Sequence, residues 1–282
     1  MSNSLWNDAW HRLLKNKLAL FGGIFLLLEL LLCLLTPWIA PYGFETQNLE
    51  LTLAKPSLVH WFGTDTLGRD LFTRILYGGR ISISVGLLAS LVSVLVGVIY
   101  GAISGFVGGR TDNILMRIVD ILYALPFIFL VIILMVYFGR NILLLFVALG
   151  LTQWLTMARI VRGQVISLKQ KEFIEAAKSL GVKTRTIILK HLIPNTLGPV
   201  IVYLTLTVPS VILEEAFLSF LGLGVQAPMA SWGTLISNGV EVMEIAPWVL
   251  FFPAVMLALT LFSLNFLGDG LRDALDPKGA RD

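Results

Sequence analysis

Six long apolar stretches constrain this chain more than any other feature. A helix needs about 20 mostly apolar residues to cross the hydrocarbon core of a bilayer. Stretches of this kind cover residues 18–35, 81–107, 114–138, 142–158, 197–221 and 248–267. The segments between them carry charge, proline or glycine, and they lack the short alternating pattern of membrane-barrel strands. The sequence therefore predicts an all-α integral membrane protein with six transmembrane helices.

The charge content excludes an ordinary soluble domain. Of 282 residues, 56% are hydrophobic and only 14% are charged, whereas about a quarter of the residues of a soluble domain are charged. The first apolar stretch follows Arg12, Lys15 and Lys17, as the core of a signal peptide would. It is too long for that and lacks a small-residue cleavage site. We therefore interpret it as a retained first span.

The positions of lysine and arginine predict that both termini are cytoplasmic. Cytoplasmic loops of membrane proteins carry an excess of these residues. With the N-terminus inside, the basic cluster between Arg159 and Lys190 is cytoplasmic. The predicted parts are an N-terminal tail (1–17), a first span (18–36), an outer loop with a short surface helix (37–80), a five-helix core (81–272) and a C-terminal tail (273–282). The core includes the cytoplasmic segment 159–195.

Small residues and prolines indicate how the spans pack. Gly97, Gly101 and Gly105 recur every four residues, which places them on one helix face where another helix can approach closely. The partner is a helix of the same chain, which we favour, or a second subunit. Kinks or flexible points are predicted at four prolines within spans: Pro126, Pro199, Pro209 and Pro253.

Charged residues at membrane depth need partners, since each costs roughly 2.5–3.5 kcal/mol if it faces lipid. Arg117 and Asp120 lie three residues apart on a helix, so we predict an ion pair between them. Glu214 and Glu215 lie near the outer end of the fifth span. They are either interfacial or line a pathway or gate, where they would meet the amino group of a substrate. The sequence assigns no role to Glu29.

The cytoplasmic segment 159–195 has the pattern of two short helices. Ser167 with Gln170 resembles a capping box that opens the first helix, and Gly181 ends it at positive φ. The second helix is predicted over 183–192, stopped by Pro194.

One face of the first predicted helix is apolar and carries Phe173, Ala176, Ala177 and Leu180. A helix with such a face suits docking into a groove on a partner protein. The alternative is a basic amphipathic helix that rests on anionic lipid.

The same segment carries a family signature. The string EFIEAAKSLG, followed by HLIPN, resembles the EAA motif of bacterial ABC importer permeases. The residues that match the motif are Glu175, Ala176, Ala177, Gly181 and Pro194. His191 stands where the general motif has isoleucine, as in the peptide-transport branch. The resemblance implies a type I permease fold in which this segment forms coupling helices that sit in a cleft of an ATPase subunit.

Three further blocks extend the resemblance over nearly the whole chain. Residues 62–83, 215–224 and 268–278 are similar to blocks of the C-type subunits of oligopeptide permeases, although Thr73 stands where serine is usual. The resemblance implies an oligopeptide importer of the bacterial inner membrane. Permeases for dipeptides, nickel and antimicrobial peptides share most of these blocks.

The resemblance also implies partners: a second permease subunit of the B type, two ATPase subunits that hold ATP and Mg²⁺, and an extracytoplasmic peptide-binding protein. The chain itself has no phosphate-loop motif. His11, His60 and His191 lack metal-ligand spacing, and no nucleophile–base pair is evident. We therefore expect a non-catalytic subunit without metal or cofactor, in contact with lipid but not with nucleic acid. A stand-alone channel or secondary transporter would show inverted repeats or paired mid-depth charges, and neither is visible.

The outer block 62–80 is predicted to form a short helix on the membrane surface. Asp65 with Arg69, and Asp70 with Arg74, have the four-residue spacing of helical ion pairs. These residues either orient the pathway mouth or the surface that meets the binding protein, or they belong to a merely solvated helix.

Overall fold

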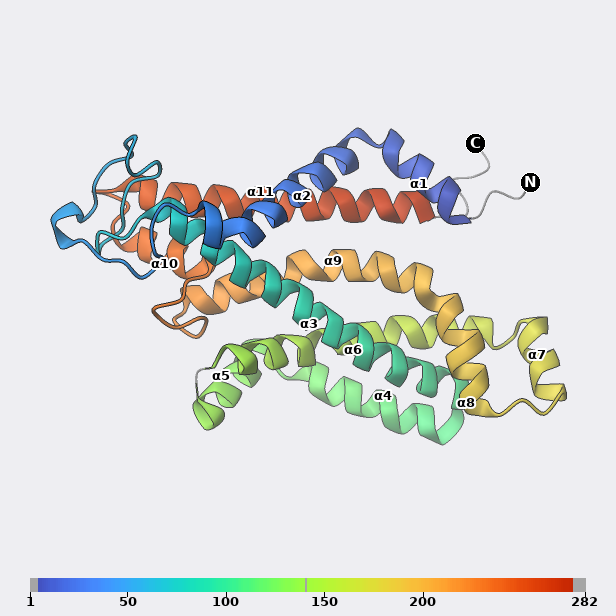
Figure 1. Cartoon of the computed structure of the whole chain (residues 1–282). Helices are drawn as coiled ribbons and strands as arrows, with labels where there is room; N and C mark the ends of the chain where they lie inside the picture. Colours follow the sequence, from blue (N-terminus) through green and yellow to red (C-terminus); the bar gives the residue numbers. More distant parts are fainter. Residues whose placement is uncertain (1–4, 140, 276–282) are drawn as a thin grey trace.

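The computed structural model describes residues 5–139 and 141–275, and Figure 1 shows them as an elongated bundle of helices. Within this part of the chain, five helices are long and apolar enough to cross a membrane. They are α2 (Lys17–Ile39), α3 (Leu71–Val107), α6 (Ile142–Leu168), α9 (Ile193–Phe220, continuous with the turns from Thr184) and α11 (Pro247–Leu275). Each corresponds to a predicted span, although α9 ends at Phe220, one residue before the predicted end of the fifth span, and the all-α expectation is confirmed for the described residues.

The predicted third span is present but broken. Helices α4 (Gly109–Ala124) and α5 (Phe127–Phe138) meet at an angle of 85°. The break falls at Leu125 and Pro126: Leu125 is extended, at φ −78° and ψ 126°. Proline disfavours a helical conformation of the residue before it and has no N–H to continue the helical hydrogen bonds. The kink predicted at Pro126 is therefore confirmed, and it is sharp enough to divide the predicted third span into two helices.

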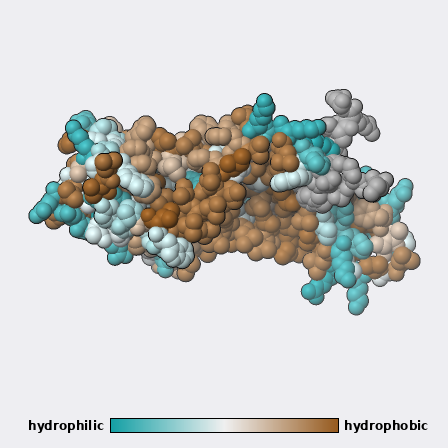
Figure 2. Space-filling view, turned by 45° about the horizontal axis from the view of Figure 1, so that its top comes forward, coloured by the Kyte–Doolittle hydropathy of each residue, from teal (hydrophilic) through white to brown (hydrophobic). Residues whose placement is uncertain are grey.

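The shorter elements divide between the two ends of the bundle (Figure 1). The end that we call the α7 end carries α1 (Leu5–Lys15), α7 (Glu172–Ser179), α8 (Thr184–Thr186) and the π-helix η2 (Ile187–Leu192). The opposite end, the loop end, carries residues 40–70, with the 3-10 helix η1 (Leu49–Leu51), and α10 (Trp232–Glu241). Figure 2 shows an apolar band across the middle of the molecule and hydrophilic residues at both ends, as a membrane-spanning protein requires.

The glycine stripe of α3 packs against α6 of the same chain. A Cβ added at Gly97 would lie 2.6 Å from the Cβ of Met157, and one added at Gly105 would lie 2.8 Å from the carbonyl oxygen of Arg162. Neither position has room for a larger side chain. The stripe therefore serves close packing within the subunit, the first of the two predicted alternatives.

Helices α2 and α11 form a second close pair, and Glu29 of α2 faces α11. The carboxylate is 3% exposed, and Oε1 accepts a 2.6 Å hydrogen bond from the hydroxyl of Thr260 on α11. Glu29 thus faces a neighbouring helix rather than lipid, which lowers the free-energy cost of its position.

Candidate functional site

Helix α7 begins later than the sequence pattern indicates. Ser167 still belongs to α6, which ends at Leu168, and the N–H of Lys169 donates to the carbonyl of Val165 and closes the last turn of that helix. The residue before α7 is Lys171, whose side chain makes no capping hydrogen bond. A capping box at Ser167 was therefore wrong. The predicted end is confirmed: Gly181 has φ +71°, a left-handed conformation that favours glycine.

The two faces of α7 have different environments. Ile174 is buried and Ala177 is 8% exposed, and both belong to the hydrophobic cluster that contains Leu192 and residues of α3 and α6. Phe173 is 44% exposed and Leu180 is 82% exposed. The four residues predicted to share a face are thus divided, because Ala177 anchors the helix to the bundle. The outward face, which also carries Ala176, is apolar and uncovered in this chain.

Charged side chains surround the base of α7. Glu175 is exposed and lines a shallow cavity with Asp112, Lys169 and Lys178. The ammonium groups of Lys169 and Lys178 lie 5.7 and 5.2 Å from the centre of the Phe106 ring. These cation–π contacts connect the helix and the turn before it to the end of α3.

The chain after α7 continues directly into a transmembrane helix. The turn α8 leads into the π-helix η2, and η2 leads into α9, in which Pro194 occupies the first turn. Pro194 follows the point where π-helical hydrogen bonding ends: the N–H of Ile193 still donates to the carbonyl of Ile188. A second helix stopped by Pro194 was therefore wrong. His191, in η2, is partly buried. The segment from Thr184 to Phe220 thus runs without a break from α8 into α9.

A salt-bridge network at the α7 end connects three helices. Arg162 on α6 forms a fork with Asp112 on α4, with Nε–Oδ1 and Nη2–Oδ2 distances of 2.6 Å each. Ser104 on α3 donates to the same carboxylate at 2.5 Å. No local sequence pattern predicts this network, because its members are 8 to 58 residues apart.

The ion pair predicted between Arg117 and Asp120 was wrong. Asp120 pairs with Arg159 on α6, at an Nη2–Oδ1 distance of 2.7 Å. Arg159 also stacks over the ring of Tyr123, with 4.4 Å from its guanidinium carbon to the ring centre. Asp120 thus pairs with an arginine on a neighbouring helix rather than with Arg117 on its own helix.

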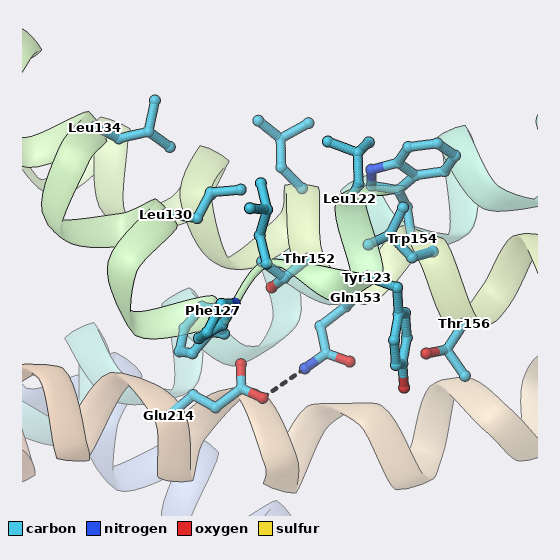
Figure 3. Close-up of a pocket in the computed structure, with 14 residues that line it drawn as sticks. Leu122, Tyr123, Phe127, Leu130, Leu134, Thr152, Gln153, Trp154, Thr156 and Glu214 are labelled. Carbon is cyan, nitrogen blue, oxygen red and sulfur yellow. Dashed lines mark hydrogen bonds between the residues drawn. The ribbon is translucent and has the colours of Figure 1, made fainter. Parts of the chain in front are cut away.

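A cavity of about 540 Å³ opens where the α4–α5 bend faces α6 and α9 (Figure 3). Its wall is mostly apolar and includes Leu122, Leu125, Pro126, Phe127, Leu130 and Leu134. Polar groups come from Tyr123, Thr152, Gln153, Thr156 and Glu214. The amide of Gln153 donates to Oε1 of Glu214 at 2.8 Å. The size is within the range of roughly 300–1,000 Å³ that is typical of ligand pockets.

The two adjacent glutamates predicted at a pathway have different surroundings. Successive residues of an α-helix point about 100° apart. Glu214 lines the cavity, whereas Glu215 is 0% exposed and accepts hydrogen bonds from Ser219 at 2.6 Å and Ser82 at 3.2 Å. Ser82 in turn accepts from the N–H of Trp232 at the start of α10. Glu215 thus joins α3, α9 and α10, away from the cavity.

The outer block at the loop end is not a surface helix. Its first part is an irregular loop, and its helical part is the start of α3, whose first turn Asp70 caps through the N–H of Thr73 at 2.8 Å. The ring of Phe62 stacks on Phe252 of α11, with 4.1 Å between the ring centres. This contact holds the loop against the bundle. The spacing of charged residues within the block does not predict a contact with a helix so distant in sequence.

The charged residues of this block are buried and pair in a different way. Asp65 accepts from Arg69 at 2.7 Å, as predicted, and also lies 3.4 Å from Arg74. Asp70 does not pair with Arg74 but with Nδ1 of His60, at 2.8 Å. All five side chains belong to residues that are 2–8% exposed. A solvated helix is therefore excluded, and these residues form an internal network.

A metal centre does not emerge from the part of the chain that the structure describes. No group of three or more histidine, cysteine, aspartate or glutamate residues there could hold a metal ion.

Comparisons with known proteins agree over nearly the full length. Residues 93–281 match the family model of the binding-protein-dependent transport system inner membrane component, and residues 4–56 match the N-terminal TM domain of oligopeptide transport permease C. The chain is 55% identical, over 98% of its length and 92% of the relative's, to the oligopeptide transport system permease protein OppC of Escherichia coli K12. It is 51% identical to the dipeptide transport system permease protein DppC of Bacillus subtilis, over 98% and 87%.

The fold also resembles a solved structure. A chain of the MetNI methionine ABC transporter, in an inward-facing conformation, superposes with a TM-score of 0.58 and 19% identity. The match covers 73% of this chain and 96% of that one. The type I importer permease fold that the sequence resemblance implies is thereby confirmed.

Proposed function

The chain belongs to the family of inner membrane components of binding-protein-dependent transport systems, and we propose that its substrates are oligopeptides. As a member, it is a non-catalytic, membrane-spanning subunit of an ABC importer. The observation that carries the substrate class is the 55% identity with an oligopeptide permease over 98% of the chain. Dipeptides are the second candidate, favoured by the 51% identity with DppC.

In this proposal the chain forms half of the translocation pathway. A homologous second permease of the B type forms the other half, and an extracytoplasmic protein delivers the peptide. Two ATPase subunits bind ATP and Mg²⁺. The long apolar helices with a bend at membrane depth support this role, because irregular backbone in a membrane is tolerated where it lines a cavity.

Helix α7 is the proposed coupling helix. Phe173, Ala176 and Leu180 provide an apolar face that suits a groove in an ATPase subunit. Glu175 offers a carboxylate beside this face, and Gly181 permits the bend that follows it. Because η2 runs without a break into α9, closure of the ATPase subunits would move a transmembrane helix.

The proposed orientation has the α7 end in the cytoplasm. It rests on the excess of lysine and arginine in the segment 159–195. Reporter fusions after Asn48 or Asn238, both at the loop end, should report the outer side, and a fusion after Lys183 should report the cytoplasm. A cytoplasmic signal at Asn48 would overturn the orientation.

Uptake measurements test the substrate class. In cells that lack the gene, uptake of labelled oligopeptides should fall and should return when the gene is supplied on a plasmid. Uptake of dipeptides and of nickel, measured in the same cells, should change little. A loss confined to dipeptides would support the second candidate, and a loss confined to nickel would contradict both.

A further inference from the structure

Glu214 lies at membrane depth on the wall of the cavity. It precedes the end of α9 at Phe220 by six residues, or about 9 Å along the helix axis. Carboxylates at such positions are costly, and they normally face the protein interior, where they pair with another group. The residues that line the cavity therefore indicate which group pairs with Glu214.

Within the described residues, Glu214 has one polar partner and no cationic one. Gln153 donates to Oε1, while Oε2 is buried without a hydrogen-bond partner. No lysine or arginine forms a salt bridge with it there, whereas Asp65 and Asp112 both pair with arginine. A buried carboxylate with one unsatisfied oxygen is unfavourable until a donor reaches it.

The surroundings of Glu214 strengthen its attraction to a positively charged group that enters the cavity. The leucines and Phe127 exclude water from much of the wall, and a low local dielectric makes an ion pair stronger than in solution. The opposite wall is the bend at Leu125 and Pro126, and irregular backbone in a membrane is tolerated where it is buried in protein or lines a cavity, not where it faces lipid. The hydroxyls of Thr152 and Thr156 add neutral hydrogen-bonding groups.

We propose that Glu214, oriented by Gln153, binds the α-ammonium group of a peptide in transit. This inference rests on the proposed function. The ammonium group supplies the positive charge and the donors that the carboxylate lacks. Every unmodified peptide carries this group whatever its side chains, so the contact recognises peptides as a class. The apolar wall and the neutral hydroxyls provide no charged group that would select particular peptide side chains.

The test compares one peptide in two forms, with a free and with an acetylated amino terminus. The complete importer is reconstituted in proteoliposomes with its binding protein, and initial ATP-dependent uptake is measured. Glu214→Gln should lower the ratio of free to acetylated uptake about ten-fold, since a charged hydrogen bond is replaced by a neutral one. Any preference of the binding protein for one form of the peptide cancels when the ratios of variant and wild type are compared, because that subunit is unchanged. Glu214→Asp should restore part of the ratio.

Glu29→Gln is the matched control. It also removes a buried carboxylate at membrane depth, but on α2, where Glu29 accepts a hydrogen bond from Thr260. The ratio should stay at the wild-type value. An unchanged ratio in Glu214→Gln would overturn the inference. So would loss of the second permease in Glu214→Gln alone, which would place the partner of Glu214 on that subunit. A wild-type complex that transports neither form would instead refute the proposed function, and the inference with it.

Discussion

The two ends of the bundle use their side chains in opposite ways. At the loop end, Asp65, Arg69, Asp70 and Arg74 are 2–7% exposed, and each has a partner within the chain: Asp65 pairs with both arginines, and Asp70 pairs with His60. At the α7 end, apolar side chains lie on the surface, and Leu180 is 82% exposed. Charged side chains are thus buried at the loop end, and apolar side chains are exposed at the α7 end.

This difference teaches which part of the chain is complete by itself. A buried ion network is satisfied only when each charge has its partner, and removal of one partner is strongly destabilising. An exposed apolar helix face contributes no burial free energy to the stability of the chain, and such faces are typical of interaction sites. We therefore expect changes at the loop end to affect stability, and changes on α7 to affect assembly and coupling.

The largest effect on stability is expected for Asp65→Ala. The substitution leaves Arg69 and Arg74 buried without their shared carboxylate. The free energy of unfolding should fall by about 3–5 kcal/mol. The melting temperature of the purified chain in detergent measures this loss.

Glu45→Ala is the control for that experiment. Glu45 lies in the same loop but is exposed, so the melting temperature should be nearly unchanged. Equal, small shifts for both variants would mean that the network contributes little, and the contrast between the two ends would not hold.

Gly181→Val should uncouple ATP hydrolysis from transport while the chain stays folded. A β-branched residue at φ +71° is strained by about 1–2 kcal/mol, and relief of that strain moves α7 relative to η2. No atom lies within 4 Å of an added Cβ, so a clash contributes nothing. The measurement is peptide-stimulated ATP hydrolysis in proteoliposomes.

Gly163→Val provides the comparison, since a Cβ there also meets no atom within 4 Å but the residue lies within α6. Its stimulation should remain near the wild-type value. Normal stimulation in both variants would show that the bend after α7 is not part of the coupling.

A smaller effect is expected for Glu175→Lys. The residue is exposed, so the chain should fold normally, but the charge is reversed beside the apolar outward face of α7, which is proposed to contact the ATPase. Retention of the ATPase subunits on purification should fall several-fold, while Glu172→Lys, an exposed neighbour, should change it less. Identical losses in the two variants would indicate a general effect of charge rather than a contact at Glu175.

The sequence predicted the spans well because the bilayer imposes a length and a composition on each helix. It also predicted the end of α7, since only glycine adopts the conformation of residue 181 without strain. It misjudged Pro194, because the same residue is compatible with the end of one helix and with the first turn of the next. Local rules do not separate these two cases.

The candidate site was less predictable because its partners are distant in sequence. Asp120 pairs with Arg159 rather than with Arg117, and Glu214 pairs with Gln153, 61 residues away. The burial of the 62–80 block depends on contacts such as that of Phe62 with Phe252. Helical spacing describes neighbours on one helix and carries no information about the helix opposite.

The central claim is that the outward face of α7 holds the ATPase subunits, and the double variant Phe173→Ser with Leu180→Ser tests it most directly. Both side chains are exposed in this chain, so membrane insertion, thermal stability and pairing with the second permease should be unchanged. Co-purification should then recover both permeases with little or no ATPase. Recovery of both ATPase subunits in the wild-type ratio, with normal peptide-stimulated ATP hydrolysis, would contradict the claim and leave α7 as a helix of the membrane surface.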